Sequence, residues 1–267
     1  MNFDKSIFNK LLAQYTSVYF ISSPPRCGST AFARVFWEHP SVHYYSHEPF
    51  EVTYYDGQTL EAVYEKLSQP LDIVPIKNGI TSKDANALVI KEMPYQVGEN
   101  FGLAASLTKQ PIVFLIRDPR LNIYSRIMKK QETGDSIFFP LQETGWELIQ
   151  KQVAYCDQEG IDYLIVDATD FRNYPKIILP QVFKRLGLFF SEEMLNWKSA
   201  AHIEIDNLDG SHSHLYKKVL SSTGIRPANE PIPVIEDFPI EKGIRTHVLQ
   251  CMEIYQDLST NKHRLTV

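Results

Sequence analysis

The sequence feature that most constrains the fold is the stretch of residues 19–37, YFISSPPRCGSTAFARVFW. It begins inside an apolar run, residues 18–21, which is typical of a buried strand and is followed by two serines and two prolines. After Gly28, apolar residues recur at helical spacing as far as Trp37. The stretch therefore predicts a strand, a tight loop and the beginning of a helix.

A junction of this kind binds anions, because the first turn of a helix has unpartnered backbone N–H groups and a partial positive charge. Glycine lets a phosphate approach the backbone, hydroxyl groups add donors, and an arginine supplies a planar cation. The predicted anion-binding residues are Arg26, Cys27, Gly28, Ser29 and Thr30. The sequence thus predicts a site for phosphate or sulfate.

The loop differs from a Walker A loop, which reads G-x-x-x-x-G-K-[ST]. Counted back from Gly28, Ser23 stands where the first glycine would be, and Ser29 stands where the lysine would be. The cation precedes the glycine by two residues instead of following it. A P-loop kinase of small molecules is therefore disfavoured, and it stays as the alternative enzyme class.

The pattern Pro-Arg-Cys-Gly-Ser-Thr of residues 25–30 resembles the 5′-phosphosulfate loop of sulfotransferases that use 3′-phosphoadenosine 5′-phosphosulfate (PAPS). That family's loop carries Lys or Arg followed by x-Gly-[Ser/Thr]-[Ser/Thr], and the arginine form is similar to that of tyrosylprotein and several bacterial sulfotransferases. The resemblance implies a PAPS-dependent sulfotransferase with a P-loop-like, three-layer α/β/α fold around a central parallel sheet. It also implies adenosine 3′,5′-bisphosphate (PAP) as the product and a reaction without a metal.

A second stretch, VFLIRDPRLNIYSR at residues 113–126, is similar to the 3′-phosphate site of the same family. The family pattern is a strand, then Arg-Asp-Pro, then a serine one or two helical turns later. The resemblance implies that Arg117 and Ser125 contact the 3′-phosphate. Arg-Asp-Pro alone is more typical of an ordinary strand exit with a local ion pair, but a chance coincidence with the first loop at this separation is improbable.

Two weaker resemblances lie further along the chain. Residues 163–197 look like the family's strand, acidic turn and helix ending in Leu-Gly-Leu, although residues 167–171, DATDF, stand where Tyr-Glu-Asp-Leu is usual. Residues 221–226, SSTGIR, are similar in position and chemistry to the C-terminal loop that folds over the nucleotide. The second of these implies a contact of Arg226 with the 3′-phosphate.

The apolar runs predict the rest of the fold. Strands are expected at residues 42–45, 87–93, 112–117 and 163–166, and helices between them at 96–108, 121–130 and 146–159. Such alternation predicts a parallel sheet covered on both faces, with ligands at the carboxyl ends of its strands. We expect one domain over residues 1–267, in which the irregular residues 200–240 form a lid or acceptor-binding segment.

Sulfuryl transfer to a hydroxyl group requires a base. Phenol and steroid sulfotransferases use a His after a Lys-Thr pair, and the corresponding residues 89–94, VIKEMP, contain none. Relatives with the arginine loop have a glutamate where Glu48 lies, and desolvation by neighbouring aromatic residues is expected to raise its pKa. Arg26 would neutralise the leaving phosphate. Lys91 is a candidate for sharing the sulfate charge, with an ion pair to Glu92 as the structural alternative.

Composition limits the partners. The formal net charge is -5, and no run of Lys and Arg is long enough to follow a nucleic-acid backbone. We find no signal peptide, no apolar run that could span a membrane and no Cys-x-x-Cys, which favours a reduced, cytoplasmic protein. His212-Ser213-His214 is too weak a pattern for a metal site.

The acceptor is not specified by any motif. The loops at residues 44–83 and 200–240 are rich in aromatic and acidic residues, which favours a small, cationic or aromatic acceptor over an acidic polysaccharide. The acidic residues are Glu48, Glu51, Asp56, Glu61, Glu204, Asp206 and Asp209. A nucleotide-binding protein without catalysis is the alternative from another functional class, and the oligomeric state is not predicted.

Overall fold

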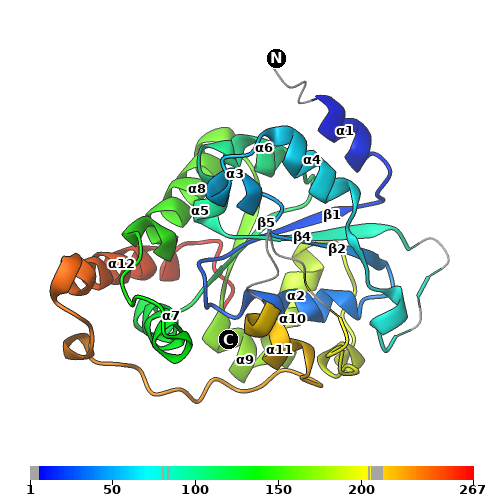
Figure 1. The fold of residues 1–267 in the computed structure, drawn as a ribbon. Coiled ribbons are helices and arrows are strands. Elements are labelled where there is room, and N and C mark those ends of the chain that lie inside the picture. Colours follow the sequence, from blue (N-terminus) through cyan, green and yellow to red (C-terminus); the bar gives the residue numbers. More distant parts are fainter. Residues whose placement is uncertain (1–5, 80, 83–84, 204, 206–212) are drawn as a thin grey trace.

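The computed structural model describes residues 6–79, 81–82, 85–203, 205 and 213–267. A twisted central sheet lies between two layers of helices (Figure 1), as the apolar strand runs predict. Its strands are β1 Val18–Ser22, β2 Val42–His47, β3 Leu71–Asp72, β4 Ala87–Glu92, β5 Ile112–Ile116 and β6 Tyr163–Asp167. The expected α/β fold with a parallel sheet is confirmed.

The strand order is β3-β2-β4-β1-β5-β6, and every pairing is parallel except that of β2 with the short β3. Strand β1 therefore lies between β4 and β5. Strands β4 and β2 lie on one side of β1, and β5 and β6 lie on the other. The sheet reverses its direction of growth between β1 and β5, where open α/β sheets form their ligand crevice.

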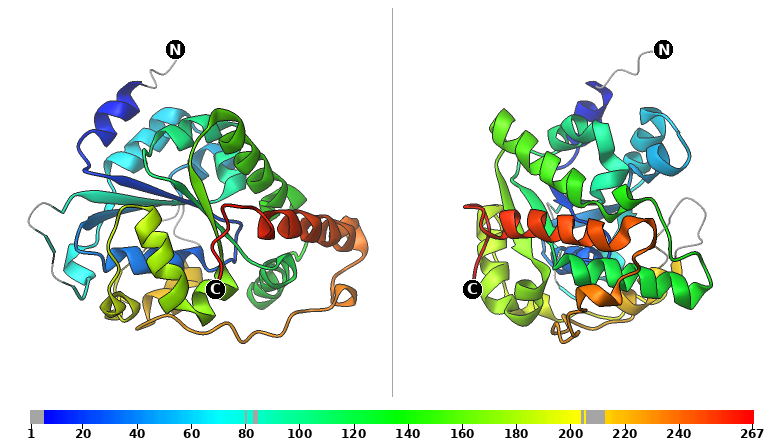
Figure 2. Two further views of the ribbon diagram at one scale, coloured as in Figure 1. Left: turned by 180° about the vertical axis from the view of Figure 1, so that it is seen from behind. Right: turned by 90° about the vertical axis from the view of Figure 1, so that its left-hand side faces the viewer.

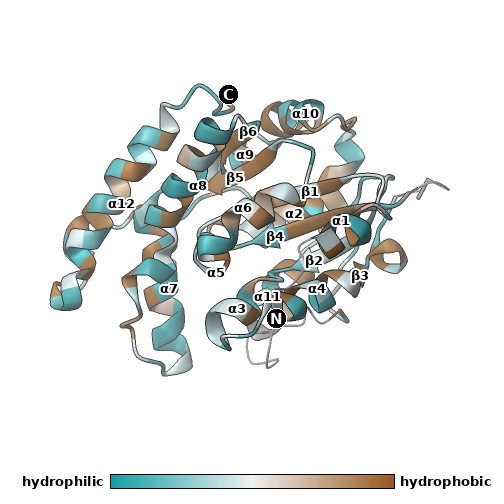
Figure 3. Cartoon of the chain, turned by 90° about the horizontal axis from the view of Figure 1, so that it is seen from above, coloured by the Kyte–Doolittle hydropathy of each residue, from teal (hydrophilic) through white to brown (hydrophobic). Residues whose placement is uncertain are grey.

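Helices cover both faces of the sheet (Figures 1 and 2), and alternate residues of each strand enter one of two apolar cores. In β1, for example, Phe20 belongs to one core and Ile21 to the other. Figure 3 shows hydrophobic central strands and helices whose outward surfaces are more polar. The helices are α1 Ser6–Leu12, α2 Ser29–Trp37, α3 Glu51–Tyr55, α4 Leu60–Ser68, α5 Pro94–Val97, α6 Phe101–Ser106, α7 Pro119–Thr133, α8 Trp146–Glu159, α9 Ala168–Asn173, α10 Pro175–Arg185, α11 Ser213–Leu220 and α12 Ile244–Ser259.

Three details differ from the sequence prediction. The helix expected at residues 96–108 is divided into α5, a 3-10 turn and α6, because Gly98 adopts a positive φ that an α-helix does not allow. Within the loop expected at residues 44–83, residues 71–76 form β3 and a 3-10 turn, Val74–Ile76. The irregular segment 200–240 contains α11, and between α11 and α12 the chain follows a long extended course (Figure 2).

Candidate active site

The predicted site residues gather where the parallel strands end. The loop of residues 23–28 follows β1, Arg117 follows β5, Glu48 follows β2, and Lys91 is the penultimate residue of β4. Because β4, β1 and β5 are neighbours, Lys91 and Arg117 lie on opposite sides of the loop. The sheet thus places a cation on each flank of the predicted anion site.

The loop after β1 has the conformation of an anion-binding turn. Gly28 is the residue before α2 and has a φ of 83°, and a Cβ atom at this position would meet nothing within 4 Å. Glycine is therefore required by the backbone conformation, and the space beside it is open. Cys27 is buried, and burial raises the pKa of its thiol to about 12. A contact of Cys27 with an anion would therefore involve its backbone.

Two of the predicted residues have unusual backbone conformations. Among the residues that the structure describes, Arg26, Glu48 and Lys242 are the non-glycine residues with positive φ. Backbone strain of this kind is concentrated at functional sites and persists only where neighbouring contacts hold it. Neighbouring groups hold both positions here: Arg117 donates to the Arg26 carbonyl, and the Glu48 N–H donates to the Lys91 carbonyl at 2.8 Å.

The phosphosulfate and 3′-phosphate motifs meet in space, although about 90 residues separate them in the chain. Arg117 Nη1 lies 3.3 Å from the Arg26 carbonyl oxygen, and Arg26 Nε lies 3.3 Å from Ser125 Oγ. Asn122, on the same helix as Ser125, donates to the Pro25 carbonyl oxygen at 3.1 Å. Helix α7 therefore supports the loop as well as contributing to the site.

Arg117 also contacts a residue that the sequence analysis missed. Its Nη2 lies 3.3 Å from Glu230 Oε2, and Arg172 of α9 donates to the same carboxylate. Arg172 Nε donates to the carbonyl oxygen of Arg226 at 2.9 Å, whereas the Arg226 side chain is exposed. The sequence did offer a signal for Arg172, because this arginine lies about one turn into the helix that follows the buried strand β6.

Glu48 is buried and accepts several hydrogen bonds. Lys91 Nζ contacts Glu48 Oε1, Gln96 Nε2 donates to Oε2 at 2.8 Å, and His47 Nε2 lies 3.2 Å from Oε1. Burial alone raises the pKa of Glu48, but the Lys91 ammonium and His47 outweigh it and hold the pKa well below its ordinary value. The expectation of a raised pKa was therefore wrong, because it omitted Lys91.

Glu92 does not hold Lys91. Its carboxylate accepts the backbone N–H groups of Phe50 at 2.8 Å and Met93 at 2.9 Å. Complete burial, with the nearby charge of Glu48, keeps the pKa of Glu92 well above its ordinary value. Adjacent residues of a strand point to opposite faces, so Lys91 pairs across to Glu48 and not to its neighbour.

Three tyrosines close to Glu48 form an aromatic surface, the tyrosine cluster of Tyr54, Tyr55 and Tyr95. The Tyr54 ring packs edge-on against both others, with ring centroids 4.9 Å apart in each pair, and the Tyr55 and Tyr95 hydroxyls lie 2.7 Å apart. Burial raises the pKa of Tyr95, and the charge of Glu48 acts in the same direction. The cluster therefore lies within electrostatic reach of the candidate base.

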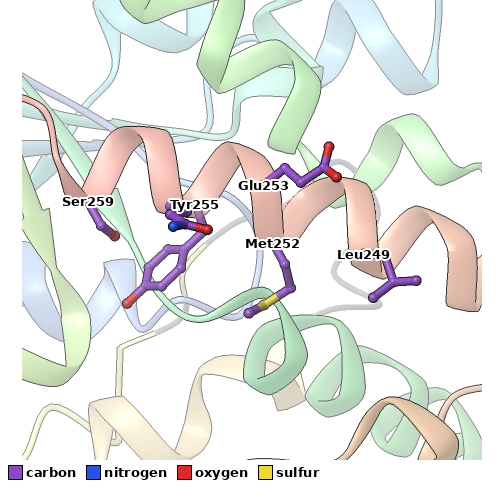
Figure 4. A pocket seen from close by; sticks show the side chains of 6 residues that line it. Leu249, Met252, Glu253, Tyr255 and Ser259 are labelled. Atoms are coloured by element: carbon purple, nitrogen blue, oxygen red, sulfur yellow. The ribbon is translucent and has the colours of Figure 1, made fainter.

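Other parts of the molecule offer weaker sites. A shallow pocket on α12 is lined by side chains of that helix alone, none of them predicted for the site (Figure 4): Leu249, Met252, Glu253, Tyr255, Gln256 and Ser259. Within the described part of the chain there is no group of three or more His, Cys, Asp or Glu side chains that could hold a metal, and no helix with the length and hydrophobicity to cross a membrane. His212 lies outside the described residues.

Comparison with known proteins identifies a family and similar folds. The sulfotransferase domain family matches residues 19–243. A sulfotransferase domain of the curacin biosynthetic pathway is similar in structure, with a TM-score of 0.51 and 17% identity over 92% of this chain and 98% of that chain. A sulfotransferase domain of the Synechococcus PCC 7002 olefin synthase has the same TM-score and identity over 91% and 96%. No curated protein sequence matches the chain.

Replacing Lys91 by Met is expected to reverse the effect of Glu48 on the pH dependence of stability. In the wild type the lowered pKa of Glu48 gives stability that is present above the ordinary value of 4.5 and is lost as pH falls through the folded pKa. Without the ammonium, burial raises the pKa, so the variant loses stability as pH rises above that value. In urea unfolding, the free energy of unfolding of the variant should fall below that of the wild type by an amount that grows between about pH 5 and about pH 8, reaching about 3 kcal/mol.

The control for this prediction is the double variant Glu48→Gln/Lys91→Met, in which the pH-dependent part of the deficit should disappear. A deficit of the same size at every pH would show that Lys91 stabilises the protein without regard to the charge of Glu48.

Proposed function

The chain belongs to the sulfotransferase domain family and is a PAPS-dependent sulfotransferase, and on that premise we propose that it sulfates a hydroxyl or amine of a small aromatic acceptor. The observation that carries the assignment of the donor site is the meeting of Arg26, Arg117 and Ser125. Two motifs distant in sequence would not be expected to combine in this way unless they served one ligand with two anionic groups.

The residues present fit such a donor. Arg117 is largely buried, and its Nε atom has no hydrogen-bond partner among the residues that the structure describes. A buried donor left unpaired is unfavourable, so an added acceptor such as a phosphate oxygen would be bound favourably there. The open space beside Gly28 and the hydroxyls of Ser29 and Thr30 suit a second anionic group at the beginning of α2.

When bound, PAPS supplies an activated sulfuryl group and leaves as PAP. Arg26 and the N–H groups at the beginning of α2 would stabilise negative charge that grows on the departing phosphate. Ser125, on α7, would help to hold the 3′-phosphate with Arg117. Arg226 stays a proposed contact from the segment after α11. These roles are positioning and electrostatic, as transfer between anionic groups requires.

We assign the base to Glu48 and the sharing of sulfuryl charge to Lys91. Lys91 neutralises Glu48, which makes the carboxylate a weak base. An anionic donor beside β4 would compete for the ammonium. Weakening of the Lys91–Glu48 contact would then raise the pKa of Glu48, because burial alone favours the protonated form. Base strength would in this way depend on the presence of the donor.

The tyrosine cluster is the proposed contact surface for the acceptor. It is formed by α3, which begins three residues after Glu48, and by α5, which follows β4. Two of the acidic residues give less support to a cationic acceptor, because Glu48 pairs with Lys91 and Glu51 pairs with Lys66 at 2.8 Å. Glu204, Asp206 and Asp209 lie outside the described residues. We also propose that residues 200–240 cover the acceptor, since Tyr216 of α11 packs against the His47 ring.

Arg117→Ala should weaken binding of PAP at least tenfold without magnesium, because the 3′-phosphate loses its buried cationic partner. Isothermal titration calorimetry measures this, with 5′-AMP as the ligand that lacks the 3′-phosphate. Arg120→Ala is the matched control, since Arg120 pairs locally with Asp118 at 2.7 Å, and its affinity should stay within about threefold. Binding of ATP with magnesium but not of PAP would replace the sulfotransferase proposal by the kinase.

Glu48→Gln should lower the turnover of a phenol acceptor by about 10²–10³-fold, with no loss of PAP affinity, because the amide cannot accept the proton. The assay follows transfer from radiolabelled PAPS to tyrosol. Glu51→Gln is the control: Glu51 is also buried and paired with a lysine, and its turnover should change little. Equal turnover in the wild type and Glu48→Gln would remove Glu48 as the base, and PAP binding without any transfer would favour a non-catalytic protein.

Tyrosol should be a better acceptor than 4-hydroxyphenylacetate or heparin, because the tyrosine cluster offers aromatic contact and, once the donor competes for Lys91, the charge of Glu48 opposes an anionic acceptor. Tyr55→Ala should raise the KM for tyrosol roughly three- to tenfold and leave the affinity for PAP unchanged. Steady-state kinetics with each acceptor measures both effects. Faster sulfation of heparin than of tyrosol would contradict the proposed acceptor class.

A further inference from the structure

Two arginines from neighbouring strand ends hold one carboxylate. Arg117 follows β5, and Arg172 lies in α9, directly after β6. Arg172 Nη1 lies 3.1 Å from Glu230 Oε1 and 3.3 Å from Oε2, and Arg117 Nη2 lies 3.3 Å from Oε2. Glu230 comes from the extended segment between α11 and α12 (Figure 1). Side chains from three separate parts of the chain thus meet at one anionic group.

Arg172 is oriented by the same segment. Its Nε and Nη2 atoms donate to the carbonyl oxygens of Arg226 and Pro227, at 2.9 Å and 2.8 Å, and Nη1 alone of its nitrogens is directed to Glu230. The segment is fixed further by Asn173, whose side chain accepts the Ala228 N–H at 2.8 Å. One edge of the guanidinium is therefore anchored to backbone, while the other is available to an anion.

The carboxylate does not satisfy the two arginines fully. Arg117 keeps a buried Nε without a partner among the described residues, and its contact with Glu230 is at the long end of the hydrogen-bond range. The Glu230 side chain is 48% exposed, so it can leave without disturbing a core. A phosphate has more oxygen acceptors and more charge than a carboxylate, so it matches two converging guanidinium groups better.

We propose that Arg172 and Arg117 together bind the 3′-phosphate of the donor, and that the phosphate displaces Glu230, which contacts both arginines. The inference rests on the proposed donor site. Burial raises the pKa of Glu230, but Arg172 and Arg117 outweigh it and lower the pKa, so Glu230 is a charged competitor at neutral pH. Competition of this kind lowers the apparent affinity for the 3′-phosphate, because only the fraction of molecules in which Glu230 has left the arginines can bind it.

This competition acts on 3′-phosphorylated ligands alone. A nucleotide that lacks the 3′-phosphate has no group to exchange for Glu230 and leaves it in place. PAP, the product, must displace the Glu230 carboxylate in order to bind. The return of the carboxylate to the two arginines then favours release of PAP. Glu230 therefore weakens retention of the product without affecting ligands that do not enter the two-arginine site.

The test is calorimetric titration of PAP and of 5′-AMP into the wild type, Glu230→Gln, Arg172→Met and the double variant. Glu230→Gln should tighten PAP binding about three- to tenfold, and Arg172→Met should weaken it more than tenfold. Both should leave 5′-AMP within about twofold. In the Arg172→Met background, Glu230→Gln should have a smaller effect on PAP. Circular dichroism and thermal unfolding establish that each variant is folded.

Glu236→Gln is the matched control. Glu236 lies in the same segment and is exposed. Glu236→Gln changes the net charge by the same amount and leaves Glu230 in place, so the PAP affinity of this variant should equal that of the wild type. If PAP binds and requires Arg117, but Glu230→Gln does not tighten it or Arg172→Met does not weaken it, this inference is wrong and the donor site stands. If PAP fails to bind, or Arg117→Ala has no effect, the proposed donor site itself is wrong.

Discussion

The site depends on one constraint, which is that five parallel strands end at the same edge of the sheet. Except for β2, which contains His43, each of these strands is apolar where it crosses the molecule, and each is polar or charged at or just beyond its last residue. Parallel strands buried on both faces cannot hold charges along their length, so ionisable groups collect at the ends. The residues concerned are Ser22, Glu48, Glu92, Arg117 and Asp167.

Charges at this edge are largely buried, and a buried charge needs a partner. The protein supplies these partners itself, with Glu48 for Lys91 and Glu230 for Arg117. An overall acidic chain can therefore contain a cationic site, because Lys91 and Arg117 are each paired with a carboxylate of the same chain. The net charge of -5 says little about the ligand.

The sequence was sufficient to predict the strands and turns that a local residue pattern specifies. The strands, the loop after β1 and the strand exit at Arg117 all have short, periodic or motif-like signals, and the parallel sheet then implies that the motifs meet. Contacts between unrelated positions had no such signal. Glu48 and Lys91 are 43 residues apart, and Arg172 and Glu230 are 58 apart. The pKa of Glu48 was predicted in the wrong direction because the value depends on such a pair and not on neighbours in sequence.

The positions of the two internal ion pairs bear on which nucleotides the site can distinguish. Strand β1 separates β4 from β5, so Lys91–Glu48 and Arg117–Glu230 lie on opposite flanks of the loop. On our proposals, a donor with an anionic group at each end exchanges with both pairs, whereas a nucleotide with a 5′-phosphate alone addresses only one flank. Recognition of the donor and strengthening of the base would then arise from the same replacement of internal counterions. Selectivity for the 3′-phosphate would follow from the geometry of the sheet and would need no further specificity element.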